Sequence, residues 1–121
     1  MIRRPDIQPL ASVEPFDRYP RRRLRRLAAH ADRVRVPKGT VLAQEGGLVH
    51  EMVVVLEGEV VASRRGGHVR RLGTGARFGA LELVIGAPHP ETLVADTELE
   101  VLVVNGPAYR GAVQTLPGLA S

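Results

Sequence analysis

Residues 52–60 read MVVVLEGEV, in which two runs of β-prone residues lie on either side of Gly58. Glycine permits the tight turn that a chain needs between two short strands. The pattern continues in both directions, and the β-prone runs are residues 33–36, 40–43, 52–56, 59–63, 68–72, 92–95 and 99–104. Several short strands at this spacing predict a sandwich, jelly roll or small barrel. A parallel α/β sheet is disfavoured, because no helix-length segment lies between the strands.

Helical periodicity is confined to the two ends of the chain. Near the start, Leu24, Leu27, Ala28 and Ala31 fall at i, i+3, i+4 and i+7, which is one helical face. Near the end, Pro107 opens a predicted helix at the position where its missing donor costs nothing. The sequence therefore predicts one domain over 1–121, with a helical lead-in at about 7–31, a β-roll at about 33–104 and a closing helix at about 107–116.

The composition restricts the class of protein. With 121 residues, of which 44% are hydrophobic and 25% charged, the chain can bury one core. It contains no cysteine, which excludes disulfides, thiolate metal sites and cysteine nucleophiles. The N-terminal residues lack the apolar core of a signal peptide, and no stretch is long and apolar enough to span a membrane. We therefore expect a cytoplasmic protein without membrane insertion.

The positive charge is concentrated near the start of the chain. The net charge is +4, and five arginines crowd residues 21–26, while the remainder is close to balanced. No aromatic residue is interleaved with them to stack on bases. We interpret this run as a solvated helix face, and not as a nucleic-acid or membrane patch.

Three stretches in a fixed order resemble a known family. They are PKGTVLAQEG at residues 37–46, MVVVLEGEV at 52–60 and LGTGARFG at 72–79. Together they resemble the cyclic-nucleotide-binding domain family, of the catabolite-activator effector type, from about Phe16 to Leu119. The resemblance implies a mainly β fold, a double-stranded, jelly-roll-like β-roll of about eight short strands. Short N-terminal helices, a cassette helix near 79–85 and a short C-terminal helix complete the expected fold.

In that family the segment after Phe-Gly is the phosphate-binding cassette. It is similar to Phe-Gly-Glu-Leu-Ala-Leu, a short spacer, and then Pro-Arg-Ala-Ala-Thr. The resemblance implies that the arginine pairs with the cyclic phosphate and that the glutamate accepts a hydrogen bond from the ribose 2′-hydroxyl. The late threonine adds a contact to phosphate or base. Backbone N–H groups at the start of the short helix also face an anion.

Here the cassette retains the family's frame but lacks its two main polar contacts. Residues 78–92 read FGALELVIGAPHPET, so Ala80 stands at the glutamate position and His89 at the arginine position. Glu82 comes two positions late, which turns it to a different helix face. Pro90 removes a backbone donor, and Glu91 adds negative charge beside the expected phosphate. By resemblance, the candidate pocket residues are Phe78, Gly79, Ala80, Leu81, Glu82, Leu83, His89, Pro90 and Thr92.

The loss of these two contacts would make a micromolar nucleotide binder at best a marginal one. Each charged hydrogen bond is worth about 1.5 to 3 kcal/mol, so losing both costs about 3 to 6 kcal/mol, on the order of 10² to 10⁴ in affinity. His89, with an ordinary pKa near ~6.5, is mostly neutral in the cytoplasm and lacks the planar fork of arginine. We therefore predict a non-enzymatic regulatory module with weak or no cAMP or cGMP binding, whose surfaces serve protein contacts.

Several alternatives stay open. One is a genuine cAMP sensor with an unusual pocket, and another is a site for a different anion or a small apolar ligand. A cupin-like metal enzyme is a further alternative, because residues 50–60 resemble the first cupin motif. However, Met52 stands at the second histidine of that motif, and the four histidines are scattered. We expect no catalytic residues, metal ligands or cofactor.

The expected partners are a cyclic nucleotide or other small anion, and a protein partner or the other domains of a longer parent chain. Direct DNA binding by this chain is not expected, because the chain ends at Ser121, before the long helix and DNA-reading helix-turn-helix of many relatives. The parent polypeptide, the oligomeric state and whether the chain is an excised domain stay open.

Overall fold

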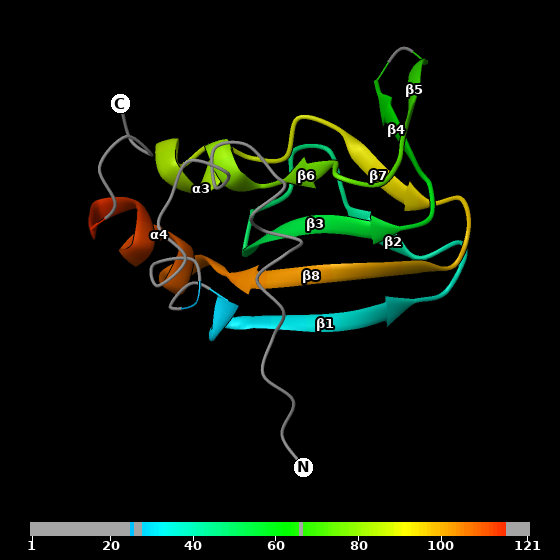
Figure 1. Cartoon of the computed structure of the whole chain (residues 1–121). Helices are drawn as coiled ribbons and strands as arrows, with labels where there is room; N and C mark the ends of the chain where they lie inside the picture. Colours follow the sequence, from blue (N-terminus) through cyan, green and yellow to red (C-terminus); the bar gives the residue numbers. More distant parts are fainter. Residues whose placement is uncertain (1–24, 26–27, 66, 116–121) are drawn as a thin grey trace.

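The described residues form two four-stranded antiparallel sheets and two short helices (Figure 1). The structure is a computed structural model, and it describes residue 25 and the segments 28–65 and 67–115. The strands and helices are β1 (Ala31–Val36), β2 (Val41–Ala43), β3 (Glu51–Glu57), β4 (Val60–Arg64), β5 (His68–Leu72), β6 (Arg77–Phe78), α3 (Ala80–Ile85), β7 (Thr92–Ala95), β8 (Leu99–Asn105) and α4 (Gly106–Thr115). One sheet has the order β1-β8-β3-β6 and the other β2-β7-β4-β5.

The central strand β3 of the first sheet is buried on both of its faces. Alternate residues of a strand point to opposite faces, yet all of the residues from Met52 to Val55 are buried. Met52 and Val54 belong to a cluster with the helices, whereas Val53 and Val55 belong to a cluster with the second sheet. This arrangement explains why β3 is a continuous apolar run and does not alternate.

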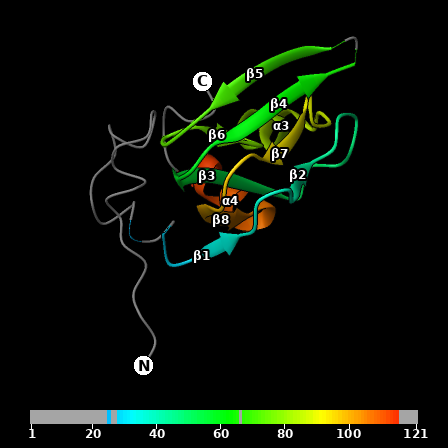
Figure 2. The ribbon, with the colours of Figure 1, turned by 90° about the vertical axis from the view of Figure 1, so that its right-hand side faces the viewer.

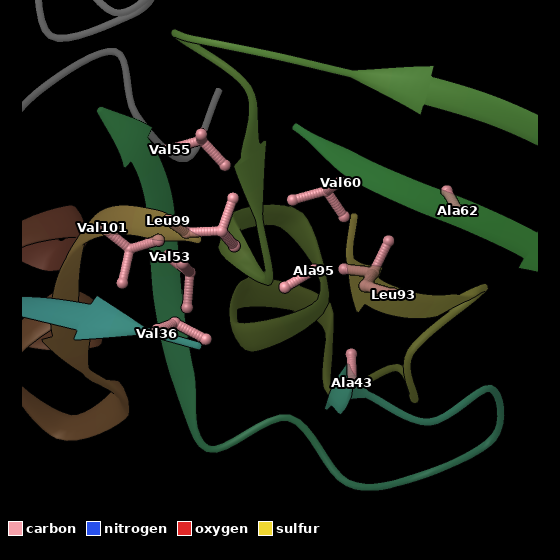
Figure 3. Packing of buried hydrophobic residues seen from close by; sticks show 10 residues of the cluster. All are labelled: Val36, Ala43, Val53, Val55, Val60, Ala62, Leu93, Ala95, Leu99 and Val101. Atoms are coloured by element: carbon pink, nitrogen blue, oxygen red, sulfur yellow. The ribbon is translucent and has the colours of Figure 1, made fainter. Parts of the chain in front are cut away.

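The cluster that contains Val53 and Val55, called the second core cluster below, fills the space between the two sheets. Figure 3 shows side chains of the first sheet, such as Val53 and Leu99, across from Val60 and Leu93 of the second sheet. These side chains are 9% exposed or less. Burying an aliphatic side chain of this size contributes about 1.5 to 3 kcal/mol. This layer therefore holds the two sheets face to face.

The cluster that contains Met52 and Val54, called the first core cluster below, attaches the helices to one end of the roll. Leu83 of α3 and Tyr109 of α4 pack with Met52, Leu102 and Val104 of the first sheet. Figures 1 and 2 show α3 and α4 together beside that sheet, away from the tip of the β4–β5 hairpin. The cassette helix is therefore held by the hydrophobic core and not by loops alone.

The predicted mainly β roll is confirmed, with small differences at its ends. The strands at 68–72 and 92–95 were predicted with the observed bounds. β6 was not predicted, because two residues are too short to show a period. The cassette helix begins at Ala80, and Gly79 is its N-cap. The closing helix begins at Gly106, one residue earlier than expected, and is described to Thr115.

The predicted lead-in at 7–31 lies largely outside the described residues. Arg25 and Ala28 are helical, with Ala28 buried and Arg25 exposed, as the helical face requires. The prediction that the helix extends to Ala31 is wrong. Ala31 begins β1 and pairs with Val104 of β8, so the roll starts two residues earlier than expected and ends at residue 105. Pairing with β8 outweighs the local helical pattern at this residue.

Candidate functional site

A buried glycine turns the chain from β6 into the cassette helix. Gly79 has φ +86°, and a Cβ there would overlap the carbonyl oxygen of Glu51. Only glycine combines this left-handed conformation with so close an approach of two backbones. The N–H of Leu83 donates to the carbonyl of Gly79 at 2.9 Å, and the N–H of Gly86 closes the helix on Glu82 at 2.8 Å. The cassette helix is thus a six-residue helix between two left-handed glycines.

A cavity of about 90 Å³ lies where the two ends of the cassette meet. It lies at the junction of three strands, since β5, β6 and β7 each contribute to its wall. The lining residues are Arg70, Arg77, Phe78, Gly79, Glu82, His89, Pro90, Glu91 and Leu93. The cavity therefore contains the glycine turn and the position at which the family places its arginine.

Arg70 and Glu91 form a two-pronged ion pair at this cavity. The Arg70 Nε donates to Glu91 Oε2 at 3.0 Å, and Nη2 donates to Oε1 at 2.6 Å. The Glu91 side chain is only 6% exposed, whereas that of Arg70 is 49% exposed. The hydrogen bonds from Arg70 hold the pKa of Glu91 below its usual range, against the opposing effect of burial. Glu91 is therefore a buried carboxylate in its charged form.

Strand register explains why Arg70 reaches the cavity and its neighbour does not. Arg70 lies opposite Ala62 of β4, which is fully buried, so Arg70 is on the inner face of the second sheet. Arg71 lies opposite Val61 and is on the outer face. There it pairs with Asp96 and lies 3.6 Å from Glu59. Two adjacent arginines thus have acidic partners on opposite faces.

His89 is half-buried and does not replace the missing arginine. Burial lowers its pKa, against a smaller rise from Glu82 and a further lowering by His50. It is therefore neutral near pH 7 and offers no fixed positive charge to an anion. Its backbone exchanges two hydrogen bonds with the loop after β2, at 2.8 Å from Gly46 N–H and 2.9 Å to the Gly47 carbonyl. The residue is held mainly by its backbone.

The structure places five of the nine predicted pocket residues at the cavity, namely Phe78, Gly79, Glu82, His89 and Pro90. Glu82 lines the cavity, although its position two residues after Ala80 was expected to turn it to a different face of the helix.

The other four predicted residues do not line this cavity. Ala80 and Leu83 pack against the first core cluster, and Leu81 is 64% exposed. Thr92 has another partner for its hydroxyl, which accepts a hydrogen bond from the N–H of Glu45 at 3.0 Å.

Arg70 and Arg77 were not predicted as site residues. The charge of Glu91 was expected beside the phosphate, and a buried carboxylate requires a cationic or hydrogen-bonding partner. Strand alternation in the correctly predicted run at 68–72 offered two adjacent arginines, of which only one could point inward. The missing information was which of the two it was, and that depends on the register with β4.

A larger cavity of about 330 Å³ lies next to the first and shares Phe78, His89 and Leu93 with it. It opens between β2 and β3 and is lined by both apolar and polar side chains, including His50 and Glu51. Within the described segments, no group of three histidine or acidic side chains is arranged to hold a metal ion. No helix in the same segments is long and apolar enough to cross a membrane.

Residues 33–115 match the family described as the cyclic nucleotide-binding domain. The chain belongs to this family. A cyclic nucleotide-gated potassium channel from Rhizobium etli is 34% identical to this cyclic nucleotide-binding domain over 67 residues. The match covers 55% of the chain but only 19% of the channel, so the chain corresponds to a small part of that protein.

Solved structures share the fold of this cyclic nucleotide-binding domain at low identity. The sensor domain of the transcriptional regulator DNR from Pseudomonas aeruginosa has a TM-score of 0.80 at 21% identity, covering 95% of this chain and 85% of that one. The regulatory subunit of a cAMP-independent protein kinase A from Trypanosoma brucei has a TM-score of 0.77 at 20% identity, covering 89% and 42%. The regulatory domain of Toxoplasma gondii protein kinase A, crystallised with cAMP, has a TM-score of 0.77 at 21% identity, covering 94% and 44%.

Proposed function

We propose that this domain is a non-enzymatic regulatory module that binds cAMP and cGMP weakly or not at all. The observation that carries the proposal is the buried carboxylate of Glu91, paired to Arg70 at the cavity of the cassette. A negative group at this place repels a phosphate and also neutralises the nearest inward-facing cation. Ala80 and His89, at the positions of the family's glutamate and arginine, leave both of its main contacts unmade.

The charges of the side chains that line the cavity support the same proposal. Two arginines and two carboxylates line it, and His89 is neutral near pH 7, so the side chains give no net attraction for an anion. A phosphate would have to break the ion pair with Glu91 before it could bind the Arg70 guanidinium at this cavity.

Regulation through protein contacts is consistent with the names of the similar proteins. One of them is named as the regulatory subunit of a protein kinase A that is independent of cAMP. We propose that the partner here is another protein or another domain of a longer cytoplasmic chain.

Isothermal titration calorimetry with cAMP and with cGMP tests the proposal. We expect no saturable heat up to about 0.1 mM ligand, because two charge-assisted contacts are absent. Thermal unfolding with and without each nucleotide provides a second readout, in which the midpoint should not move. A dissociation constant in the low micromolar range or below would contradict the proposal and favour a second candidate, a cyclic-nucleotide sensor that uses Arg70 and Arg77 as its cations.

A further inference from the structure

The ion pair at the cassette uses the edge of arginine that also binds phosphate. Arg70 presents Nε and Nη2 to the two oxygens of Glu91, at 3.0 and 2.6 Å. A carboxylate and a phosphate both offer two oxygens to this edge in a fork-to-fork geometry. Glu91 and a phosphate would therefore compete for the same two donors.

The ion pair of Arg70 and Glu91 lies at the cavity of the phosphate-binding cassette. Arg70 comes from β5 on the inner face of the second sheet, while Glu91 comes two residues after His89. Both side chains line the cavity that also contains Gly79 and His89, the two ends of the cassette. A cation is thus present at the cavity, but β5 supplies it instead of the cassette.

We propose that Glu91 is a built-in occupant of the phosphate site, in which its carboxylate takes the place of a ligand's phosphodiester on the Arg70 guanidinium. The inference rests on the proposed function, since it explains why the cassette does not bind nucleotide. In the original chain the phosphate site is therefore always occupied by Glu91. If Glu91 were removed, the ligand class that fits the vacated site would be a singly charged phosphodiester such as a cyclic nucleotide.

Burial distinguishes this pair from an ordinary surface ion pair. Arg71, which follows Arg70 in β5, forms the outer pair with Asp96, and these two side chains are 64% and 36% exposed. The Glu91 side chain, in contrast, is only 6% exposed at the cavity. Removing Glu91 therefore opens buried space and frees one guanidinium edge, whereas removing Asp96 leaves an exposed arginine beside Glu59.

The test is cAMP titration of Glu91→Ala, which restores the alanine of the family's Pro-Arg-Ala-Ala-Thr sequence. We expect its affinity for cAMP to exceed that of the original chain by about tenfold to a hundredfold, the value of one charge-assisted contact. Adenosine, which lacks the phosphate, should show no such gain. Asp96→Ala is the matched control on the outer pair and should behave as the original chain.

The double variant Arg70→Ala/Glu91→Ala tests the role of the cation, and it should lose the gained affinity. A second variant, Glu82→Gln/Glu91→Ala, removes the other carboxylate at the cavity in case Arg70 turns to it. If both variants that retain Arg70 stay folded by circular dichroism and bind no cAMP, or if the gain persists without Arg70, the inference is wrong. Tight cAMP binding by the original chain would instead overturn the proposed function, so the two failures are distinct.

Discussion

At the scale of single residues, the two members of the cassette ion pair are not equivalent. Arg70 is half in water, and Glu91 is buried. Loss of Glu91 leaves a guanidinium that water can solvate, whereas loss of Arg70 leaves a buried charge without its partner. The loss of stability on breaking this ion pair therefore depends on which of the two residues is removed.

We predict that Arg70→Ala destabilises the fold more than Glu91→Ala does. Removing one partner of a buried pair costs about 3 to 5 kcal/mol, and the half-exposed guanidinium places this site toward or below the lower end of that range. Glu91→Ala should cost about 1 kcal/mol. Urea unfolding at pH 7 measures both values. Equal losses would show that water already solvates the Glu91 carboxylate.

The same two residues predict a dependence on pH. Because Arg70 lowers the pKa of Glu91 in the folded state, the pair's contribution is fully present above the unfolded pKa of about 4.3 and is lost as pH falls through the folded pKa. The stability difference between the original chain and Arg70→Ala should therefore shrink below about pH 4. A difference that stays constant from pH 7 to pH 3 would contradict this account.

At the scale of elements, the cassette depends on one glycine more than on its helix. Gly79 and Gly86 both have positive φ, but a Cβ at Gly86 meets nothing within 4 Å, whereas at Gly79 it overlaps the Glu51 carbonyl. The left-handed conformation alone costs a non-glycine residue about 1 to 2 kcal/mol. At Gly79 the backbone of β3 must also move.

We therefore predict that Gly79→Ala destabilises the domain by several kcal/mol, and Gly86→Ala by about 1 kcal/mol. Chemical denaturation of the two single variants tests this, with Gly86→Ala as the matched control for the effect of positive φ. Similar losses in both variants would mean that the contact with Glu51 is relaxed without cost.

The elements also show where sequence patterns succeed. The runs at 68–72 and 92–95 alternate or end at clear turns, and their bounds were predicted correctly. β6 is two residues long and forms only through pairing with β3, so no local pattern reveals it. Ala31 fits the face of a helix, but its pairing with Val104 places it in a strand. Local periodicity is reliable only where tertiary pairing does not compete with it.

At the scale of the whole molecule, the site combines a motif and a residue outside it. The turn at Gly79 and the altered position of His89 were readable from 78–92 alone. Arg70 was not, because it is 21 residues from Glu91 and reaches the cavity only through the register of β4 with β5 and β7. A family resemblance therefore locates this cassette without revealing what fills it.

This arrangement predicts what is needed to rebuild a nucleotide site. Restoring the two family residues with Ala80→Glu/His89→Arg should give little cAMP affinity, because Glu91 can pair with the introduced guanidinium two residues away. Adding Glu91→Ala should raise the affinity by at least about tenfold, since both arginines are then free for the phosphate.

Calorimetry with cAMP compares the double and triple variants, and circular dichroism confirms that each is folded. The Ala80→Glu change needs its own single-variant control, because Ala80 packs against the first core cluster and a longer side chain must turn outward. A double variant that binds cAMP as tightly as the triple variant would show that Glu91 is no obstacle. The weak cAMP affinity of the original chain would then be due only to the absence of the family's glutamate and arginine.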